Sequence, residues 1–432
     1  MSTAKAETIP TVDHKQHAAF FRQSGWLMIA TIAGGAMTFG VHFLTKSASV
    51  PKSQYAAFGT LLMVVACLPT MPLQMIFAQQ SALALATGRE RQLAGMIRLT
   101  WLWTFIVWLL GAASVFVFQK QIVAGWHLPD ATGLWVTLLL LLFSLWVPLF
   151  SGVLQGRQDF FWLGWSTILG CVGRFAGAVF LVLALSLGSA GMIAGALLGV
   201  GLSAAVAIWR TRDLWSLAVE RFDGKNLLRQ VLPLVFGFGA CQFMFTSDML
   251  FAKVYFSDDE MAPYLAAGTL SRALLWLVMP LAAVMFPKIV HAAAKSEKIN
   301  LFNLVVLGTA VLAICGGLGL WLVGPLLIKL VFKSTYLSAV TLIPWYAGAM
   351  VPLALANVLV NDLLARTRFG VVPWMVLLAA AYGFTLPAML NHFPGRLEVV
   401  LQTLGAFNLL LFLVCAWFTW GVKGKAKMED GR

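Results

Sequence analysis

The sequence contains little charge. Asp, Glu, Lys and Arg make up 11% of the 432 residues, whereas a soluble domain carries about 25%. Hydrophobic residues reach 60%, and the mean hydropathy is +0.86. A surface with so few charges could not keep a monomer dissolved. We therefore exclude soluble enzymes and nucleic-acid binders, and we expect an all-α integral membrane protein.

Several other features are also missing. The five cysteines lie in apolar segments without paired spacing, which predicts packing residues and neither a disulfide framework nor a metal site. No G-x-x-x-x-G-K-S/T loop is present, so neither ATP hydrolysis nor a cofactor is expected. Residues 1–19 are polar and precede no small-residue cleavage site, so no cleavable signal is expected.

Long apolar segments dominate what remains. A membrane helix needs about 20 mostly apolar residues. This criterion predicts twelve spans with short connections: 24–45, 55–79, 97–118, 132–154, 161–186, 190–209, 231–256, 263–286, 302–328, 337–362, 370–390 and 398–420.

Basic residues divide unequally between the two sides of these spans. With the N-terminus inside, 21 of the 30 Lys and Arg lie in cytoplasmic segments and seven lie outside. This bias predicts a multi-pass protein of the cytoplasmic (inner) membrane with both termini in the cytoplasm, and it accounts for most of the +13 net charge. The basic loop at 210–229 separates six spans from six, which predicts two six-helix lobes, 1–222 and 223–432.

A weak internal repeat supports this division. Residues 55–61 and 264–270 both follow the pattern Tyr-x-Ala-x-Gly-Thr-Leu and open the second and eighth spans. A proline follows each, Pro72 and Pro280. Chance similarity among Ala/Gly/Leu-rich helices is the alternative. A true repeat with six spans per half predicts two lobes in parallel orientation, a plan that transporters use.

Three ionisable residues lie near the middle of spans: Arg174 in the fifth, Asp248 in the seventh and Arg272 in the eighth. Each costs about 2.5–3.5 kcal/mol at the centre of a helix, so we expect them to face one another or a wet cavity. An Asp248–Arg272 pair could lock two neighbouring helices, which would leave Arg174 for an anionic ligand. Alternatively, Asp248 could be a coupling site for H⁺ or Na⁺.

Four further polar residues are candidates for substrate binding or, alternatively, for anchoring at the membrane interface. They are Arg22, Gln155, Gln242 and Lys253.

Three motifs resemble the multidrug/oligosaccharidyl-lipid/polysaccharide flippase superfamily, and most closely its polysaccharide and O-antigen branch. The first is Lys-Ser-Gln-Tyr-Ala-Ala-Phe-Gly at 52–59. The second is the turn Leu-Gln-Gly-Arg-Gln-Asp-Phe at 154–160. The third is the segment 247–256, followed by Tyr264 and by Leu-Ser-Arg at 270–272. The resemblance covers nearly the whole chain, and its motifs are specific only as a set.

The resemblance implies a V-shaped pair of lobes around a cationic cavity that works by alternating access. The implied activity moves a lipid-pyrophosphate-linked glycan from the inner to the outer leaflet. The implied partners are membrane lipids, polysaccharide-assembly proteins and H⁺ or Na⁺ for coupling. Span 1 lacks the acidic residue usual in the drug antiporter branch. The peptidoglycan-precursor flippases typically have fourteen spans, so that substrate is not assigned.

Two other classes stay open. A cation-coupled exporter of small amphipathic molecules should have an acidic cavity, but the three central charges sum to a positive value. A membrane glycosyltransferase or polymerase needs carboxylates or a large loop on the outer face. Here the outer connections are short, and the only acidic cluster lies at 258–260.

Overall fold

The computed structural model describes residues 26, 29–47, 50–68, 70–220, 224–275, 301–366 and 368–421. Within these ranges the regular structure is entirely helical, which confirms the predicted all-α class. Arg22, Pro280 and the predicted lobe boundary at 222/223 lie outside the described residues.

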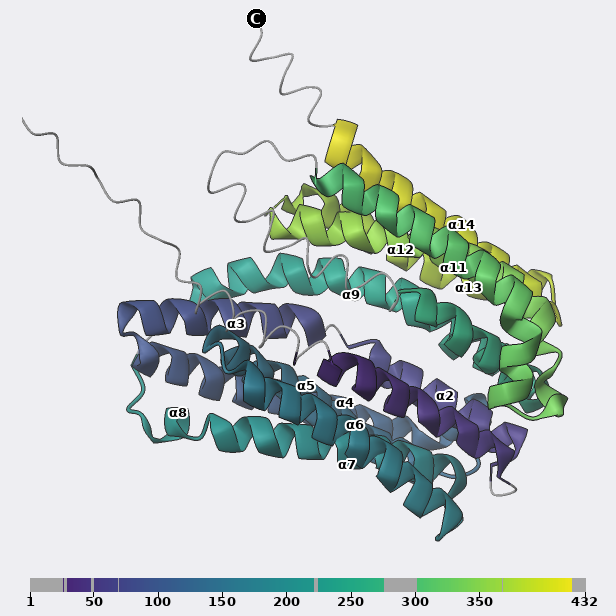
Figure 1. Cartoon of the computed structure of the whole chain (residues 1–432), viewed down its shortest axis with the longest axis horizontal. Helices are drawn as coiled ribbons and strands as arrows, with labels where there is room; N and C mark the ends of the chain where they lie inside the picture. The colour runs from purple at the N-terminus through teal and green to yellow at the C-terminus, as the bar shows by residue number, and fades with distance from the viewer. Residues whose placement is uncertain are drawn as a thin grey trace, which may run out of the picture.

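The first half of the chain forms one helical bundle (Figure 1). Helical residues 29–40 lead into the first of its elements, which are η1 (Val41–Lys46), α2 (Lys52–Ala66), α3 (Thr70–Thr87), α4 (Glu90–Gly125), α5 (Thr132–Gly156), α6 (Phe160–Leu183), α7 (Gly188–Arg210) and the short α8 (Asp213–Ser216).

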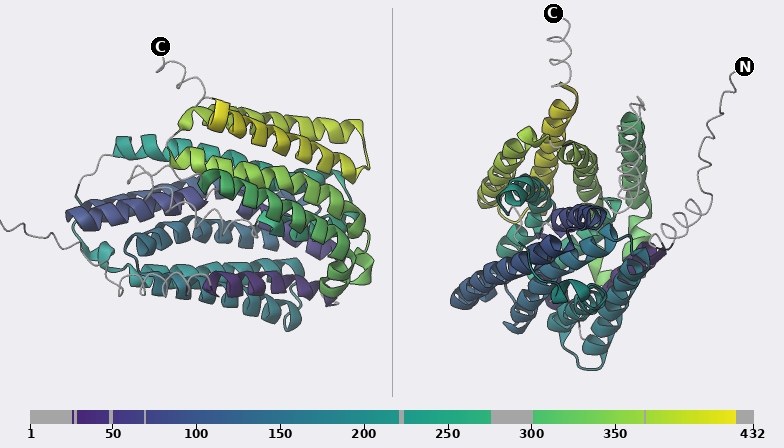
Figure 2. Two further views of the ribbon diagram at one scale, coloured as in Figure 1. Left: turned by 45° about the horizontal axis from the view of Figure 1, so that its top comes forward. Right: turned by 90° about the vertical axis from the view of Figure 1, so that its left-hand side faces the viewer.

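The second half forms another bundle. Its first helix, α9, faces the first bundle and packs against α2 and α3 (Figures 1 and 2). Helical residues 258–275 follow α9. The elements are α9 (Gly224–Tyr255), α11 (Leu301–Val331), η2 (Ser334–Tyr336), α12 (Ala339–Ala365), η3 (Phe369–Val371), α13 (Val372–His392), α14 (Leu397–Ala416) and η4 (Trp417–Gly421).

Ten helical segments of the described chain are long and apolar enough to cross a membrane. They match ten of the twelve predicted spans. The other two predictions, 24–45 and 263–286, run partly outside the described residues.

The second span is interrupted. Helix α2 ends at Ala66 and α3 begins at Thr70, with Pro72 in the first turn of α3. Proline is tolerated there because the first N–H groups of a helix have no partner within it. Close to this break, the Sγ of Cys67 lies 2.8 Å from Oγ1 of Thr246 on α9, so the interruption lies against the second bundle.

Small residues bring α6 and α7 into close contact. A Cβ atom added to Gly195 would clash with the backbone of Ala178, and one added to Gly199 would clash with the carbonyl of Gly170. Glycines spaced four residues apart allow such backbone approach. These contacts fix the position of Arg174, whose Cβ lies directly against Gly199.

Candidate functional site

One ion pair of the described helices has both side chains buried. Nη2 of Arg272, in helical residues 258–275, donates to Oδ1 of Asp248 on α9 at 2.6 Å. The side chain of Asp248 is 0% exposed and that of Arg272 is 5% exposed. The pair that the sequence suggested between neighbouring spans is therefore formed.

Two tyrosines complete the environment of this carboxylate. The hydroxyl of Tyr264 donates to Oδ2 of Asp248 at 2.7 Å, and the hydroxyl of Tyr346 on α12 donates to the same oxygen. Both tyrosines are fully buried. Asp248 thus accepts three hydrogen bonds from two other segments, as a fixed charge partner would. A coupling role elsewhere in a transport cycle stays a prediction.

Arg272 retains one unused donor. Its Nε donates to the carbonyl of Phe245 at 3.2 Å, and its guanidinium lies 5.2 Å from the ring centre of Tyr346. Its Nη1 is buried without a hydrogen-bond partner. A Cβ added to Gly268 would come within 2.8 Å of this Nη1, so glycine keeps the space beside it open. A buried unpaired donor is costly, so this position suits a water or a ligand oxygen.

Arg174 lies in the other bundle. It is half-buried on α6, and its Nε is buried without a hydrogen-bond partner. Among the described residues no carboxylate pairs with it. The two central arginines therefore occupy separate environments, one in each bundle, and only Arg272 is neutralised.

The remaining sequence candidates lie elsewhere. Gln155, at the end of α5, accepts a hydrogen bond from Nε2 of Gln74 at 3.1 Å. Lys253 is fully buried and pairs with Asp258 beyond the end of α9. Gln242 is half-buried on α9, two turns before Asp248. None of these three side chains joins the hydrogen bonds around Asp248 in the described structure.

The two bundles are joined at the end of the molecule that carries residues 46–47, 50–51 and 256–260, here called the Lys46 end. Nζ of Lys46 donates to the carbonyl of Leu330 at 2.6 Å, and Nζ of Lys333 donates to the carbonyl of Ser47 at 2.9 Å. An exposed salt bridge of 3.1 Å joins Lys52 to Asp259. Cations near the last carbonyls of a helix are favourable, and Leu330 is one residue from the end of α11.

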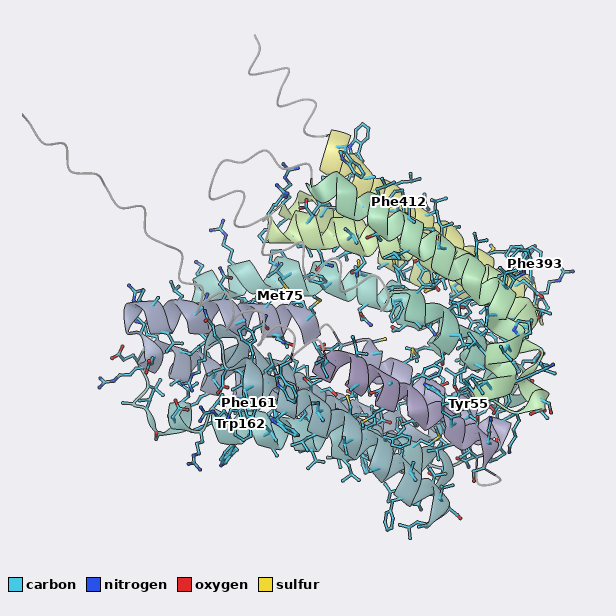
Figure 3. The ribbon with its side chains drawn as sticks, in the orientation of Figure 1. Tyr55, Met75, Phe161, Trp162, Phe393 and Phe412 are labelled. Atoms are coloured by element: carbon cyan, nitrogen blue, oxygen red, sulfur yellow. The ribbon has the colours of Figure 1, made fainter. Side chains whose placement is uncertain are left out.

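Buried aromatic rings lie beneath these contacts, around Tyr55 (Figure 3). The ring of Tyr55 lies 5.7 Å from Phe332 and 5.8 Å from Tyr336, both from the second bundle. Its hydroxyl is 2.7 Å from Nδ1 of His42. One turn further along α2, a Cβ added to Gly59 would clash with the side chain of Leu265.

The repeated motif therefore lies at the contact between the bundles. Tyr55 and Gly59 come from its first copy, and Leu265 comes from its second. At the opposite end, which carries residues 157–160 and 211–216 and is here called the Arg157 end, no polar side-chain contact between the bundles occurs among the described residues. Of the two ends, only the Lys46 end is closed by polar contacts among the described residues.

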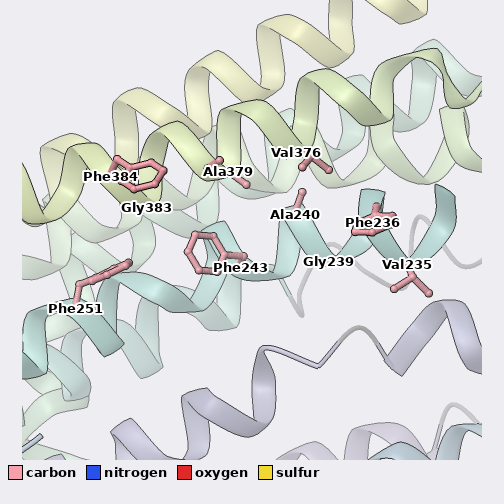
Figure 4. Close-up of a pocket in the computed structure, with 11 residues that line it drawn as sticks. Val235, Phe236, Gly239, Ala240, Phe243, Phe251, Val376, Ala379, Gly383 and Phe384 are labelled. Atoms are coloured by element: carbon pink, nitrogen blue, oxygen red, sulfur yellow. The ribbon is translucent and has the colours of Figure 1, made fainter. Parts of the chain in front are cut away.

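An apolar groove of about 590 Å³ lies between α9 and α13 (Figure 4). Small residues such as Gly239 and Gly383 form part of its wall, and Phe236 and Phe384 flank it. Phe243 lines the groove, and its ring lies edge-on to Tyr382 with ring centres 6.5 Å apart. The groove contains no group that could bind a charge.

Sequence reasoning missed Tyr346 as a partner of Asp248 and missed the lysines that join the bundles. The repeated motif contains Tyr264 and Gly268, so it could have marked both as candidate site residues. No sequence pattern marks Tyr346, since a single tyrosine in an apolar span is common at membrane interfaces.

Comparisons with known proteins give structural matches only. No protein-family model and no curated protein sequence matches the chain. The inward-facing conformation of a multidrug resistance MATE family transporter of the MOP superfamily matches with a TM-score of 0.73 and 11% identity, over 94% of this chain and 98% of that one. The chain has the fold of these transporters.

Two further structures share this transporter fold. The lipid II flippase MurJ in an inward closed conformation matches with a TM-score of 0.67 and 13% identity, over 90% of this chain and 86% of that one. The outward-facing conformation of a MATE family transporter of the MOP superfamily matches with a TM-score of 0.63 and 13% identity, over 96% and 97%. The MATE and MurJ structures match nearly the full length of the chain, which agrees with the fold that the sequence resemblance implied.

Proposed function

We propose that this protein is a flippase that moves a lipid-(pyro)phosphate-linked oligosaccharide or polysaccharide precursor from the inner to the outer leaflet of the cytoplasmic membrane. The observation that carries the proposal is the balance of buried charge. The two central arginines, Arg174 and Arg272, are balanced by a single central carboxylate, Asp248, which pairs with Arg272 alone, and each arginine keeps a buried nitrogen without a hydrogen-bond partner. An interior with surplus guanidinium donors suits a phosphate-bearing headgroup.

We also propose that the Arg157 end faces the cytoplasm, because the basic residues concentrate on that side. The closed Lys46 end then lies at the outer surface, and the structure represents an inward-facing state. The higher TM-score to the inward-facing MATE structure than to the outward-facing one, 0.73 against 0.63, supports this assignment.

Arg174 is the proposed first binding group for the headgroup, because no carboxylate neutralises it. Arg272 contributes its unused Nη1, beside Gly268. A pyrophosphate carries about two negative charges, and guanidinium groups inside the protein can replace its water through forked hydrogen bonds. The lipid tail can stay in the bilayer while the glycan crosses.

The other proposed substrate contacts are Arg22, Gln155, Gln242 and Lys253. Lys253 would become available only when its pair with Asp258 opens. Asp248 is proposed as the partner that holds Arg272, with H⁺ or Na⁺ coupling as its alternative role. Polysaccharide-assembly proteins are the proposed macromolecular partners.

Reconstituted vesicles test the function. The purified chain is inserted into liposomes with a fluorescent lipid-linked oligosaccharide, and a membrane-impermeant quencher reports which leaflet holds it. The wild type should redistribute the lipid. Arg174→Gln should lose this activity, whereas Arg89→Gln, which removes an exposed charge in the α3–α4 connection, should retain it.

The second candidate is an exporter of small amphipathic cations, which the MATE structures favour. The same vesicles loaded with ethidium distinguish the two functions. Ethidium transport by the wild type without movement of the lipid-linked sugar would refute the flippase proposal.

A further inference from the structure

The turn at 154–160, one of the three motifs that carry the family resemblance, forms part of a polar pocket of about 620 Å³ at the Arg157 end. This pocket, here called the arginine cup, lies where α5 ends, α6 begins and α7 meets α8. Its lining residues are Arg157, Gln158, Asp159, Trp209, Arg210, Arg212 and Asp213. None of them belongs to the central arginine sites.

Two ion pairs fix the walls of the arginine cup. Arg157 donates to Asp213 through both terminal nitrogens, at 3.0 and 2.6 Å. Nε of Arg210 donates to Oδ2 of Asp159 at 2.8 Å. The hydrogen bonds from Arg157 hold the pKa of Asp213 below its ordinary value, so this carboxylate stays charged at neutral pH.

Arg212 remains after this pairing. Three arginines line the cup against two carboxylates, and Arg212 makes no ion pair with a carboxylate of the described residues. Its guanidinium lies over the ring of Trp209 at 5.7 Å. Trp209 in turn packs edge-on against Trp162, with ring centres 5.1 Å apart. Stacking on an aromatic face orients a guanidinium while leaving its N–H donors free.

The surroundings of the cup are those of a membrane boundary. Trp209 is 49% exposed and Phe161 is 55% exposed, at the point where α6 begins and α7 ends. Phe161 and Trp162 lie at the same end of the bundle as α8 (Figures 1 and 3). Tryptophan and basic residues at the end of membrane spans lie at the level of lipid headgroups.

We propose that the arginine cup binds the phosphate of an anionic phospholipid headgroup in the adjoining leaflet. The lining side chains carry a net charge of +1, which one phosphodiester neutralises. Arg212 supplies forked donors to the phosphate, and the two ion pairs keep the cup shaped around it. Trp209 and Trp162 contact the glycerol backbone and the first methylenes of the lipid.

Native mass spectrometry tests the site. The full chain is released from nanodiscs of dioleoylphosphatidylcholine containing dioleoylphosphatidylglycerol, and retained phosphatidylglycerol is counted. Loss of the guanidinium in Arg212→Gln should weaken retention about tenfold, as expected for one charged hydrogen-bonding group. Arg212→Lys should restore it in part. Arg212 is exposed, so these variants should fold, and monodisperse size-exclusion profiles will check this.

Arg89→Gln is the matched control, because it removes another exposed arginine from the same end of the molecule without touching the cup. Equal loss of lipid in Arg89→Gln and Arg212→Gln would mean that diffuse surface charge holds the lipid, and the proposal would be wrong. Unchanged retention in Arg212→Gln would also overturn it. If soluble inorganic phosphate displaces the phosphatidylglycerol at matched ionic strength, the ligand is free phosphate and the lipid assignment fails.

Discussion

The buried pair of Asp248 and Arg272 can be tested by a double-mutant cycle. Asp248→Asn leaves the guanidinium with the carbonyl of Phe245 and an uncharged amide. Arg272→Gln leaves a buried carboxylate with only the two tyrosine hydroxyls. Each single change therefore strands a charge inside the second bundle. The double variant removes both charges and keeps similar side-chain volumes.

The expected free energies follow from the burial. Stranding one charge of a buried pair costs about 3–5 kcal/mol. Because the double variant strands no charge, it should cost no more than one single variant, so the coupling energy between Asp248 and Arg272 should be at least about 3 kcal/mol. Arg91 and Glu220 provide the control, since this pair is 3.5 Å apart with side chains 62% and 49% exposed. Its coupling should stay below about 1 kcal/mol.

The assay is reversible unfolding in mixed micelles, with increasing SDS and tryptophan fluorescence as the signal. If the Asp248–Arg272 coupling energy is no larger than that of Arg91 and Glu220, the pair does not hold the helices together.

A second experiment asks whether Asp248 couples transport to an ion. Transport by the same variants is compared in vesicles with imposed H⁺ and Na⁺ gradients. A wild type driven by the gradient and an Asp248→Asn variant that ignores it would make Asp248 the coupling residue.

Three further predictions concern transport, topology and closure. Arg174→Ala should abolish movement of the lipid-linked sugar while the protein still inserts into the membrane. Arg174→Lys should restore transport only in part, because lysine lacks the forked geometry of arginine. Normal transport by both variants would refute the proposed anion site. Single cysteines are placed at the exposed positions Ser257 and Ser216 in a background without native cysteines. A membrane-impermeant reagent should label the cysteine at position 257 in intact cells and not the one at position 216. Labelling at position 216 would show that the predicted topology is wrong. Gly59→Val should push against Leu265 and open the Lys46 end, so spin labels placed on the two bundles there should report longer distances; unchanged distances would show that this contact does not control closure.

The fold was largely predictable because the bilayer constrains length and composition together. Ten of the predicted spans appear as helices, and the interruption of the second span lies just before the proline at position 72. The span predicted at 97–118 is shorter than the helix that contains it, α4. It runs from Glu90 to Gly125, well beyond the apolar segment 97–118, because a helix can continue past the hydrocarbon layer with polar residues exposed to water.

The central site was predictable only where neighbours in sequence are also neighbours in space. Asp248 and Arg272 lie on successive spans, so their pairing could be inferred. Tyr346 comes from α12, and nothing in the pattern of that helix marks the turn that faces Asp248. The arginine cup was hidden for a different reason, because basic residues at span ends are expected from topology alone. Only the structure separates paired arginines from Arg212.

The lysine contacts at the Lys46 end predict which substitutions a genetic screen should recover. Both acceptors, at Leu330 and Ser47, are main-chain carbonyls, and a peptide oxygen persists whatever side chain the position carries. Substitutions at the acceptor positions should therefore leave these two hydrogen bonds in place, whereas substitutions at Lys46 or Lys333 should remove them. A screen for variants that lose these two hydrogen bonds should yield changes at the two lysines. A charge swap at a second side chain should not restore them, because among the described residues neither lysine has a side-chain acceptor.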